Sequence, residues 1–372
     1  MGPIFFQHLI RQGFRFYAAG ILSTWLLMAW PIRADAQPVE ILPAELRGAV
    51  QPQVAAAPNG NIFVAFGKGN SIYCTASMDG GKTFRPPVEV ATLPKLALGM
   101  RRGPRVVATD GAVTISAISH EAGNLYSWTS EDRGLAWSKA VVINSITNVA
   151  REGLHAMAGD GQGGIYAVWL DLRGQGTQLW GAASHDHGRT WSGNVPVYQS
   201  PDGHICECCH PSLSVSTNGS IRVMWRNWLE GSRDMFTASS TDGGRTFSRA
   251  GKLGPGTWPL KACPMDGGGL AGVYSTWRRQ NAVFYTDDQQ AEHLLSAQGR
   301  QPVVGLGKAG PYFLWQKDSQ LMLNQGLKVA PRVLAEAGAY PAIASATPDA
   351  APMAAWEGST NGLNTIFAQV LK

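Results

Sequence analysis

Residues 184–191 read Ser-His-Asp-His-Gly-Arg-Thr-Trp, and this eight-residue pattern decides the fold. Four copies begin at Ser77, Ser130, Ser184 and Ser240, so consecutive copies start 53, 54 and 56 residues apart. In each copy the Asp can accept hydrogen bonds from backbone N–H groups of its own turn, the Gly supplies a positive φ, and the final aromatic side chain can pack under a hairpin. Four copies at a period near 50 residues predict a β-propeller or a similar array.

Short stretches with alternating apolar residues repeat further along the chain. Each follows a turn containing Asn, Asp, Gly or Pro, and period-two alternation over about five residues predicts half-buried strands. Another short strand is expected before most of them, so each unit is predicted to hold four antiparallel strands. The predicted second strands of the units are residues 62–66, 113–117, 165–169, 221–225, 273–277, 311–315 and 352–356.

These seven repeats predict an all-β propeller of seven four-stranded antiparallel blades. Six blades are the alternative, because the chain after residue 36 divides into six units of about 54 residues. The last units are shorter and lack the Asp pattern. The chain ends in what is expected to be the third strand of its unit, so the segment near residues 39–42 is predicted to add the outer strand and close the ring.

Residues 1–36 are expected to be an export signal. Basic residues precede an apolar stretch over residues 17–32, which ends at a small-x-small site in residues 34–36. Cleavage after Ala36 would leave one propeller domain, residues 37–372, in the periplasm or the medium, where conditions are oxidising. An uncleaved membrane anchor is the alternative, because the region before the apolar stretch is long. No later stretch approaches the roughly 20 apolar residues that span a bilayer.

The composition excludes several classes of function. The chain is 44% hydrophobic and 15% charged, with a formal charge of +5, which argues against disorder. Its basic clusters are no larger than the pairs Arg101-Arg102 and Arg278-Arg279, so a nucleic-acid partner has no support. No Gly-rich loop follows a strand and opens a helix, so a nucleotide is not expected either. We expect a monomer.

The four turns resemble the Asp-box, or BNR, repeats of the sialidase superfamily over most of residues 50–250. The chain also resembles bacterial exported proteins described as exo-α-sialidase-like, through residues 150–155, 169–173, 206–211 and 263–268. The resemblance implies a sialidase-like propeller that binds or acts on glycans, in the catalytic case as a glycoside hydrolase of the exo-α-sialidase type. It also implies that the Asp boxes lie on the face away from the active site. Their acidic residues are Asp79, Asp132, Asp186 and Asp242.

Unusual polar residues gather in the loops before the innermost strands and after the second strands. In a propeller both sets of loops lie at one mouth of the central channel, and converging polar residues in a concavity mark the default site. A glycan or another small ligand is therefore expected there. Besides the candidates below, these loops supply Arg105, His155, Asn227, Asp266, Arg278 and Glu357.

Sialidases hold a substrate carboxylate with three arginines, use a Tyr activated by Glu as nucleophile, and protonate the leaving group with Asp. Arginine forks bind carboxylates bidentately, and glycoside cleavage needs an acid and a group that stabilises oxocarbenium charge. The Arg-Ile-Pro type tripeptide of catalytic sialidases is absent near the first strand, so enzymatic activity stays open. Alternatively, the arginines pair with acidic residues, Asp234 among them, and tie blade loops together. The candidates are Arg151, Glu152, Asp171, Arg173, Arg226 and Tyr340.

Cysteines form a second group, in a Cys-x-Cys-Cys loop before one innermost strand and a Cys-Pro-Met loop before the next. A disulfide from Cys263 to one of the other three is the ordinary expectation in an exported protein. Alternatively, thiolate, imidazole and thioether ligands would suit Cu(I) or Zn, although the spacing is not that of a zinc ribbon. A free or catalytic thiol is the third interpretation. The residues involved are Cys206, Cys208, Cys209, His210, Cys263 and Met265.

Overall fold

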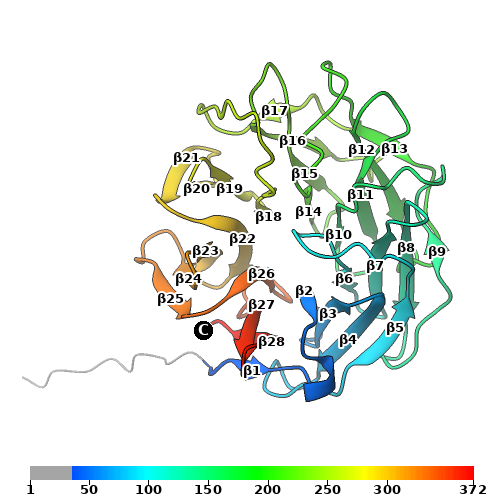
Figure 1. Cartoon of the computed structure of the whole chain (residues 1–372), viewed down its shortest axis with the longest axis vertical. Helices are drawn as coiled ribbons and strands as arrows, with labels where there is room; N and C mark the ends of the chain where they lie inside the picture. Colours follow the sequence, from blue (N-terminus) through cyan, green and yellow to red (C-terminus); the bar gives the residue numbers. More distant parts are fainter. Residues whose placement is uncertain (1–35) are drawn as a thin grey trace, which may run out of the picture. The chain divides into compact units, whose positions relative to one another are not determined.

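A computed structural model describes residues 36–372, which form seven four-stranded antiparallel sheets around a central channel (Figure 1). The prediction of an all-β, seven-bladed propeller is confirmed. The predicted export signal lies outside the described residues apart from Ala36, so its cleavage stays a prediction. Within the described part of the chain, no helix is long and apolar enough to cross a membrane.

Each blade runs from the channel to the rim. The innermost strands are β2 (Val50–Ala56), β6 (Arg105–Ala108), β10 (His155–Gly159), β14 (Ser212–Val215), β18 (Gly269–Ala271), β22 (Arg300–Gly307) and β26 (Ala339–Ala344). The second strands are β3 (Ile62–Lys68), β7 (Val113–Ser119), β11 (Ile165–Asp171), β15 (Ile221–Arg226), β19 (Tyr274–Arg279), β23 (Gly310–Lys317) and β27 (Met353–Thr360). The third strands are β4 (Ser71–Ser77), β8 (Asn124–Ser130), β12 (Gln178–Ser184), β16 (Met235–Ser240), β20 (Ala282–Thr286), β24 (Gln320–Gln325) and β28 (Leu363–Val370). The outer strands are β5 (Val88–Thr92), β9 (Val141–Val142), β13 (Val195–Tyr198), β17 (Gly251–Lys252), β21 (Glu292–Ser296), β25 (Arg332–Ala335) and β1 (Val39–Glu40).

The two ends of the described chain close the ring. β1 pairs antiparallel with β28, which places Val39 opposite Ala368 and Glu40 opposite Phe367. The Glu40 carboxylate also accepts hydrogen bonds from the Arg47 guanidinium and the Thr365 hydroxyl. The N-terminal segment is therefore the outer strand of the last blade, as the sequence predicts.

Tryptophans at one position of the second strands form the core between blades. Trp169, for example, is fully buried and packs in one cluster with Ala97 and Ile118 of the preceding blade. Burial of such large aromatic side chains is a major source of packing energy. The five equivalent tryptophans, each at most 2% exposed, are Trp169, Trp225, Trp277, Trp315 and Trp356.

The four Asp turns lie between the third and fourth strands of blades 1 to 4. In blade 3, Asp186 Oδ1 accepts the Ser184 hydroxyl at 2.8 Å and the Thr190 N–H at 2.9 Å, and Oδ2 accepts the Thr190 hydroxyl at 2.6 Å. In blade 5, Asp287 lies in the corresponding turn and accepts two backbone N–H groups, so the expectation that the last blades lack an Asp turn is wrong for this blade. The carboxylates hold the turns closed, on the face opposite the predicted site.

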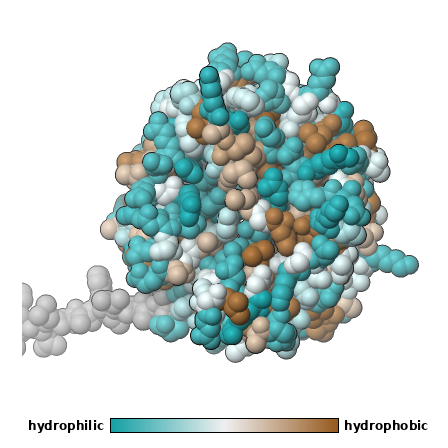
Figure 2. All heavy atoms as spheres, viewed as in Figure 1, coloured by the Kyte–Doolittle hydropathy of each residue, from teal (hydrophilic) through white to brown (hydrophobic). Residues whose placement is uncertain are grey.

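The face of the propeller drawn in Figure 2 is mainly hydrophilic, with small, separate groups of hydrophobic residues. Scattered apolar residues are normal on a protein surface. The expected monomeric state stays a prediction.

Candidate functional site

Three innermost strands begin with a bulge whose central residue is strained. Gln51, Gln301 and Tyr340 have φ of 58°, 55° and 48°, each precedes a proline, and the strand register shifts there. Bulges and positive φ in residues other than glycine are frequent at functional sites. Two of these residues form hydrogen bonds with other blades: Gln51 donates to Glu357, and Gln301 accepts from Arg101.

Arg101, in the loop before β6, reaches across the channel mouth. Its Nε donates to Gln301 Oε1 at 2.6 Å, its Nη2 to the Gln301 carbonyl at 2.8 Å, and its Nη1 to the Pro341 carbonyl at 2.7 Å. Blade 2 is thereby tied to blades 6 and 7. Burial lowers the pKa of Arg101 to about 10, against the opposing influence of Asp266 and Glu357. Sequence reasoning missed this residue, because its partners belong to distant blades and its only signal was the Arg101-Arg102 pair.

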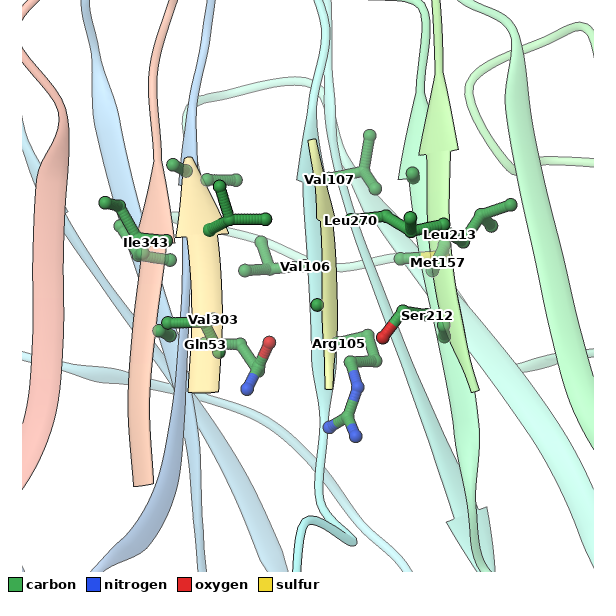
Figure 3. Close-up of a pocket in the computed structure, with 18 of the residues that line it drawn as sticks. Gln53, Arg105, Val106, Val107, Met157, Ser212, Leu213, Leu270, Val303 and Ile343 are labelled. Carbon is green, nitrogen blue, oxygen red and sulfur yellow. The ribbon is translucent and has the colours of Figure 1, made fainter. Parts of the chain in front are cut away.

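Beside this bridge, a cavity of about 300 Å³ occupies the channel and is lined by all seven innermost strands (Figure 3). Arg105 is 7% exposed, and its guanidinium donates to the carbonyls of Arg101, Gly103 and Pro104. Burial and the adjacent charge of Arg101 lower the pKa of Arg105 to about 9. The cavity therefore carries a buried positive charge at one end.

Buried histidines and carboxyl groups surround the same end of the channel. Burial, followed by the charge of Arg105, lowers the pKa of His155 well below its ordinary value, and its Nδ1 has no hydrogen-bond partner. Glu357 accepts the Gln51 N–H at 2.8 Å, and burial raises the pKa of its carboxyl group. Asp266 accepts the Gln301 N–H at 2.7 Å through Oδ2, whereas its Oδ1 has no partner.

The structure does not bring the three predicted arginines to a common partner. Arg226 is 1% exposed and donates to the backbone carbonyls of Arg233, Asp266 and Arg278. These bonds join blades 4 and 5, and they engage all three guanidinium nitrogens. The loop-tying interpretation therefore describes Arg226 better than a substrate-binding role.

The other two arginines are also engaged locally. Arg173 forms a bidentate ion pair with Asp171, at 2.9 and 2.8 Å, and lies 3.8 Å above the Trp180 ring. Arg151 is exposed and donates to the side chain of Asn148. Asp171 itself also accepts the indole N–H of Trp169 at 2.7 Å, so both of its oxygens are already in use.

Glu152 and Tyr340 are close to the mouth but do not form a pair with each other. Burial raises the pKa of the half-buried Glu152, Glu207 raises it further, and Arg102 opposes both. The Tyr340 hydroxyl donates to Met100 Sδ at 3.6 Å, and the Arg101 guanidinium lies 5.8 Å from its ring. The structure thus shows no hydrogen-bonded Tyr and Glu couple at these positions.

Three of the predicted cysteines form a compact cluster before β14. Cys206, Cys208 and Cys209 are buried, and their sulfur atoms are 3.4, 3.6 and 4.0 Å apart. Arg233 Nη1 donates to Cys206 Sγ at 3.0 Å, and Met265 packs against the cluster. The hydrogen bonds that link Cys206 to the other two thiols, followed by the Arg233 charge, lower the pKa of Cys206, whereas burial raises the pKa of Cys209 to about 12. We call these three cysteines the sulfur cluster.

The two remaining members of the predicted group lie beside the sulfur cluster. Cys263 is exposed and outside it, and all five cysteines are free thiols. Cys263 nevertheless affects the pKa of Arg233. Burial lowers this pKa, but the interactions with Cys206, Cys208 and Cys263 are larger together and raise it above the ordinary value. His210 turns to the channel, where its Nε2 lies 3.0 Å from the Gly268 carbonyl.

Sequence reasoning missed that residues 206–210, Cys-Glu-Cys-Cys-His, also have the Cys-x-x-Cys-His spacing of c-type haem attachment. The surroundings of His210 do not fit a haem. A Cβ placed on Gly267 would lie 1.8 Å from the His210 carbonyl oxygen and 2.9 Å from its Nδ1, so the neighbouring loop packs directly on this histidine. The sulfur cluster is enclosed as well.

Comparisons with known proteins give the same architecture. Residues 112–267 match the BNR repeat-like domain family. No curated protein sequence is significantly similar to the chain. A solved structure of a protein of unknown function from Dyadobacter fermentans is 16% identical, with a TM-score of 0.55, over 91% of this chain and 99% of that one.

Two solved enzymes are similar in fold. An α-L-arabinofuranosidase from Fusarium graminearum, in complex with an iminosugar inhibitor, is 13% identical with a TM-score of 0.50, over 91% of this chain and 98% of that one. The NanB sialidase from Streptococcus pneumoniae is 10% identical with a TM-score of 0.50, over 91% of this chain and 70% of that one. At such identities the similarity concerns the fold, because unrelated activities share one fold.

Proposed function

We propose that this seven-bladed propeller, which matches the BNR repeat-like domain family over residues 112–267, binds Cu(I) through the sulfur cluster. The observation that carries this proposal is the spacing of the three buried sulfur atoms, 3.4 to 4.0 Å. A metal–thiolate bond of about 2.3 Å places three sulfurs around one ion roughly 3.8 to 4.0 Å apart. The cluster therefore needs only small side-chain adjustments to hold an ion.

The donor set favours Cu(I) over Zn. Zn sites of structural type are closed by four Cys or His ligands. Here three thiols are joined by the thioether of Met265, which packs on the cluster, whereas His210 is bonded to a backbone carbonyl. Thiolate and thioether are soft ligands, which select Cu(I).

Nearby charges support a cluster of thiolates. Three thiolates and one Cu(I) ion carry a net charge of −2. Arg233 donates directly to Cys206 Sγ, and the charge of buried Arg226 acts on both Cys206 and Cys209. Two guanidinium groups thus balance the charge of the loaded site, which reduces the cost of burying it.

We further propose that the protein is periplasmic or secreted. The support is the export-signal pattern in residues 1–36. In an oxidising compartment, a bound metal would keep the three thiols from forming disulfides. Fractionation of cells and N-terminal sequencing should recover a chain that begins at Gln37; a chain that keeps its first residues in the membrane fraction would support the anchor instead.

The metal proposal is tested by titrating the reduced protein with Cu(I) under anaerobic conditions, in competition with a chromophoric Cu(I) chelator. We expect one equivalent to bind tightly, and Cys206→Ser or Cys208→Ser to lose at least about tenfold in affinity. Cys74→Ser is the matched control, because Cys74 is buried but distant from the cluster, and it should bind normally. Unchanged affinity in both cluster variants would reject the site.

Three other outcomes identify the alternatives. Tighter binding of Zn than of Cu(I) in the same competition would replace the proposed metal. A covalent haem mass on the peptide containing residues 206–210 would replace metal binding with haem attachment, against the packing around His210. Recovery of Cys263 in a disulfide peptide, without bound metal, would favour the structural interpretation.

A second candidate function is glycan binding at the channel mouth, without turnover. It is favoured by half-buried Glu152, whose raised pKa is a property of carboxyl groups that act on sugars. Hydrolysis is disfavoured because Arg173 and Arg226 are occupied by internal bonds. We expect retention on a sialoglycan or arabinan array that Glu152→Gln weakens, and no release of sialic acid or arabinose. Release of either sugar would show that the protein is a hydrolase.

A further inference from the structure

The channel cavity has one polar end and one apolar end (Figure 3). Gln53, Arg105 and Ser212 lie together at one end, and Arg105 and Ser212 are the first residues of β6 and β14. The other end is formed by aliphatic side chains further along the innermost strands. Those labelled in Figure 3 include Val107, Leu213, Leu270 and Ile343.

The charge of Arg105 has no counter-ion in the described chain. Its hydrogen bonds go to three carbonyl oxygens, and among residues 36–372 no ion pair involves it. The charged side chain that affects the pKa of Arg105 is Arg101, another cation. The carboxyl groups of Asp266 and Glu357 affect the pKa of Arg101 instead. A charge that is more than nine-tenths buried is costly unless an opposite charge accompanies it.

We propose that the channel binds a small monocarboxylate with an apolar tail. The carboxylate would lie against the Arg105 guanidinium, with the Gln53 amide beside it. The Ser212 hydroxyl lines the same end of the cavity but donates to the Gly268 carbonyl at 2.7 Å. The tail would extend along Leu213 and Leu270. A volume of about 300 Å³ is at the lower end for small-molecule sites, so the acid is short. This site is separate from the sulfur cluster and does not depend on the metal proposal.

The probes are hexanoate, its neutral counterpart hexanamide, and inorganic phosphate, each added to the purified protein in a thermal melt and in calorimetry. We expect hexanoate to raise Tm in proportion to the logarithm of its concentration. Hexanamide should have no such effect, because it lacks the charge. Phosphate should bind more weakly than hexanoate, because it gains nothing from the apolar end.

Arg105→Met distinguishes a binding role from a structural one. We expect the variant to bind hexanoate at least about tenfold more weakly. Its Tm without ligand is a separate readout, because the substitution also removes three hydrogen bonds to backbone carbonyls. An arginine that merely holds its loop predicts a lower Tm with an unchanged response to hexanoate.

Arg222→Met is the matched control. Arg222 is partly buried and, like Arg105, is bonded to a backbone carbonyl, but that of Gly272, between the first and second strands of blade 5 and away from the polar end. Its response to hexanoate should match the parent. Should Arg105→Met fail to fold, Gln53→Leu is expected to weaken the binding of hexanoate. Equal responses to hexanoate and hexanamide, or tighter phosphate binding, would overturn the proposal.

Discussion

Asp186→Ala tests whether the repeated turns are structural and separate from any binding site. The substitution removes three hydrogen bonds to the carboxylate, from Ser184 and from the N–H and hydroxyl of Thr190. Each is worth about 0.5–1.5 kcal/mol net, but the exposed Thr190 groups can bond to water instead, which reduces the loss. We therefore expect the free energy of unfolding to fall by about 1–2 kcal/mol.

Urea unfolding followed by tryptophan fluorescence measures this loss, and a melt should show a decrease in Tm of a few degrees. Asp186→Asn keeps one acceptor oxygen and should lose less. Cu(I) and hexanoate binding should be unaffected in both variants, because the turn lies on the opposite face. A variant of parental stability, or one with altered Cu(I) affinity, would refute the assignment of the turn as a structural element alone.

Three further predictions concern pH and backbone strain. The N–H of Ala136 and the Ser130 hydroxyl lower the pKa of Asp132 below its unfolded value, so the stability from this turn should be complete above about pH 4 and be lost as pH falls further, in an acid titration of Tm. Burial keeps the folded His155 neutral, whereas the same side chain is protonated in the unfolded chain below about pH 6.5, so stability should decline there. In melts between pH 6.5 and 5, His155→Gln should reduce that decline. Gly188→Ala should cost more than about 1 kcal/mol in urea unfolding, because φ is +83° and the new Cβ would lie 2.6 Å from a methyl carbon of Thr114.

Most of the fold follows from local sequence. The Asp turns and the alternating strands repeat with a near-constant period, so they indicate both the blades and the position of each strand within its blade. Ring closure by β1 is predictable for the same reason, because the last repeat lacks one strand. The turn at Asp287 escapes the pattern, since it keeps the carboxylate bonds without the flanking Ser, Gly and aromatic residues.

The site is less predictable, because it depends on partners far apart in sequence. The pattern places Arg226 at the mouth, but two of the three residues whose carbonyl groups bind it, Asp266 and Arg233, belong to irregular loops. Arg101 forms hydrogen bonds with Gln301 and Pro341, which lie 200 and 240 positions further along the chain, and no local pattern indicates these contacts. The clustering of three cysteines follows from their adjacency, whereas the exposure of Cys263 depends on the path of a long loop before β18.

Copper K-edge X-ray absorption of the Cu(I)-loaded protein tests the central claim most directly. We predict Cu(I) bound by three sulfur atoms in the parent and in Cys263→Ser, and by fewer sulfurs in Cys208→Ser. The weaker thioether of Met265 would add at most one longer sulfur contact, which Met265→Leu should remove. A spectrum dominated by nitrogen or oxygen ligands, or one unchanged by Cys208→Ser, would contradict the account.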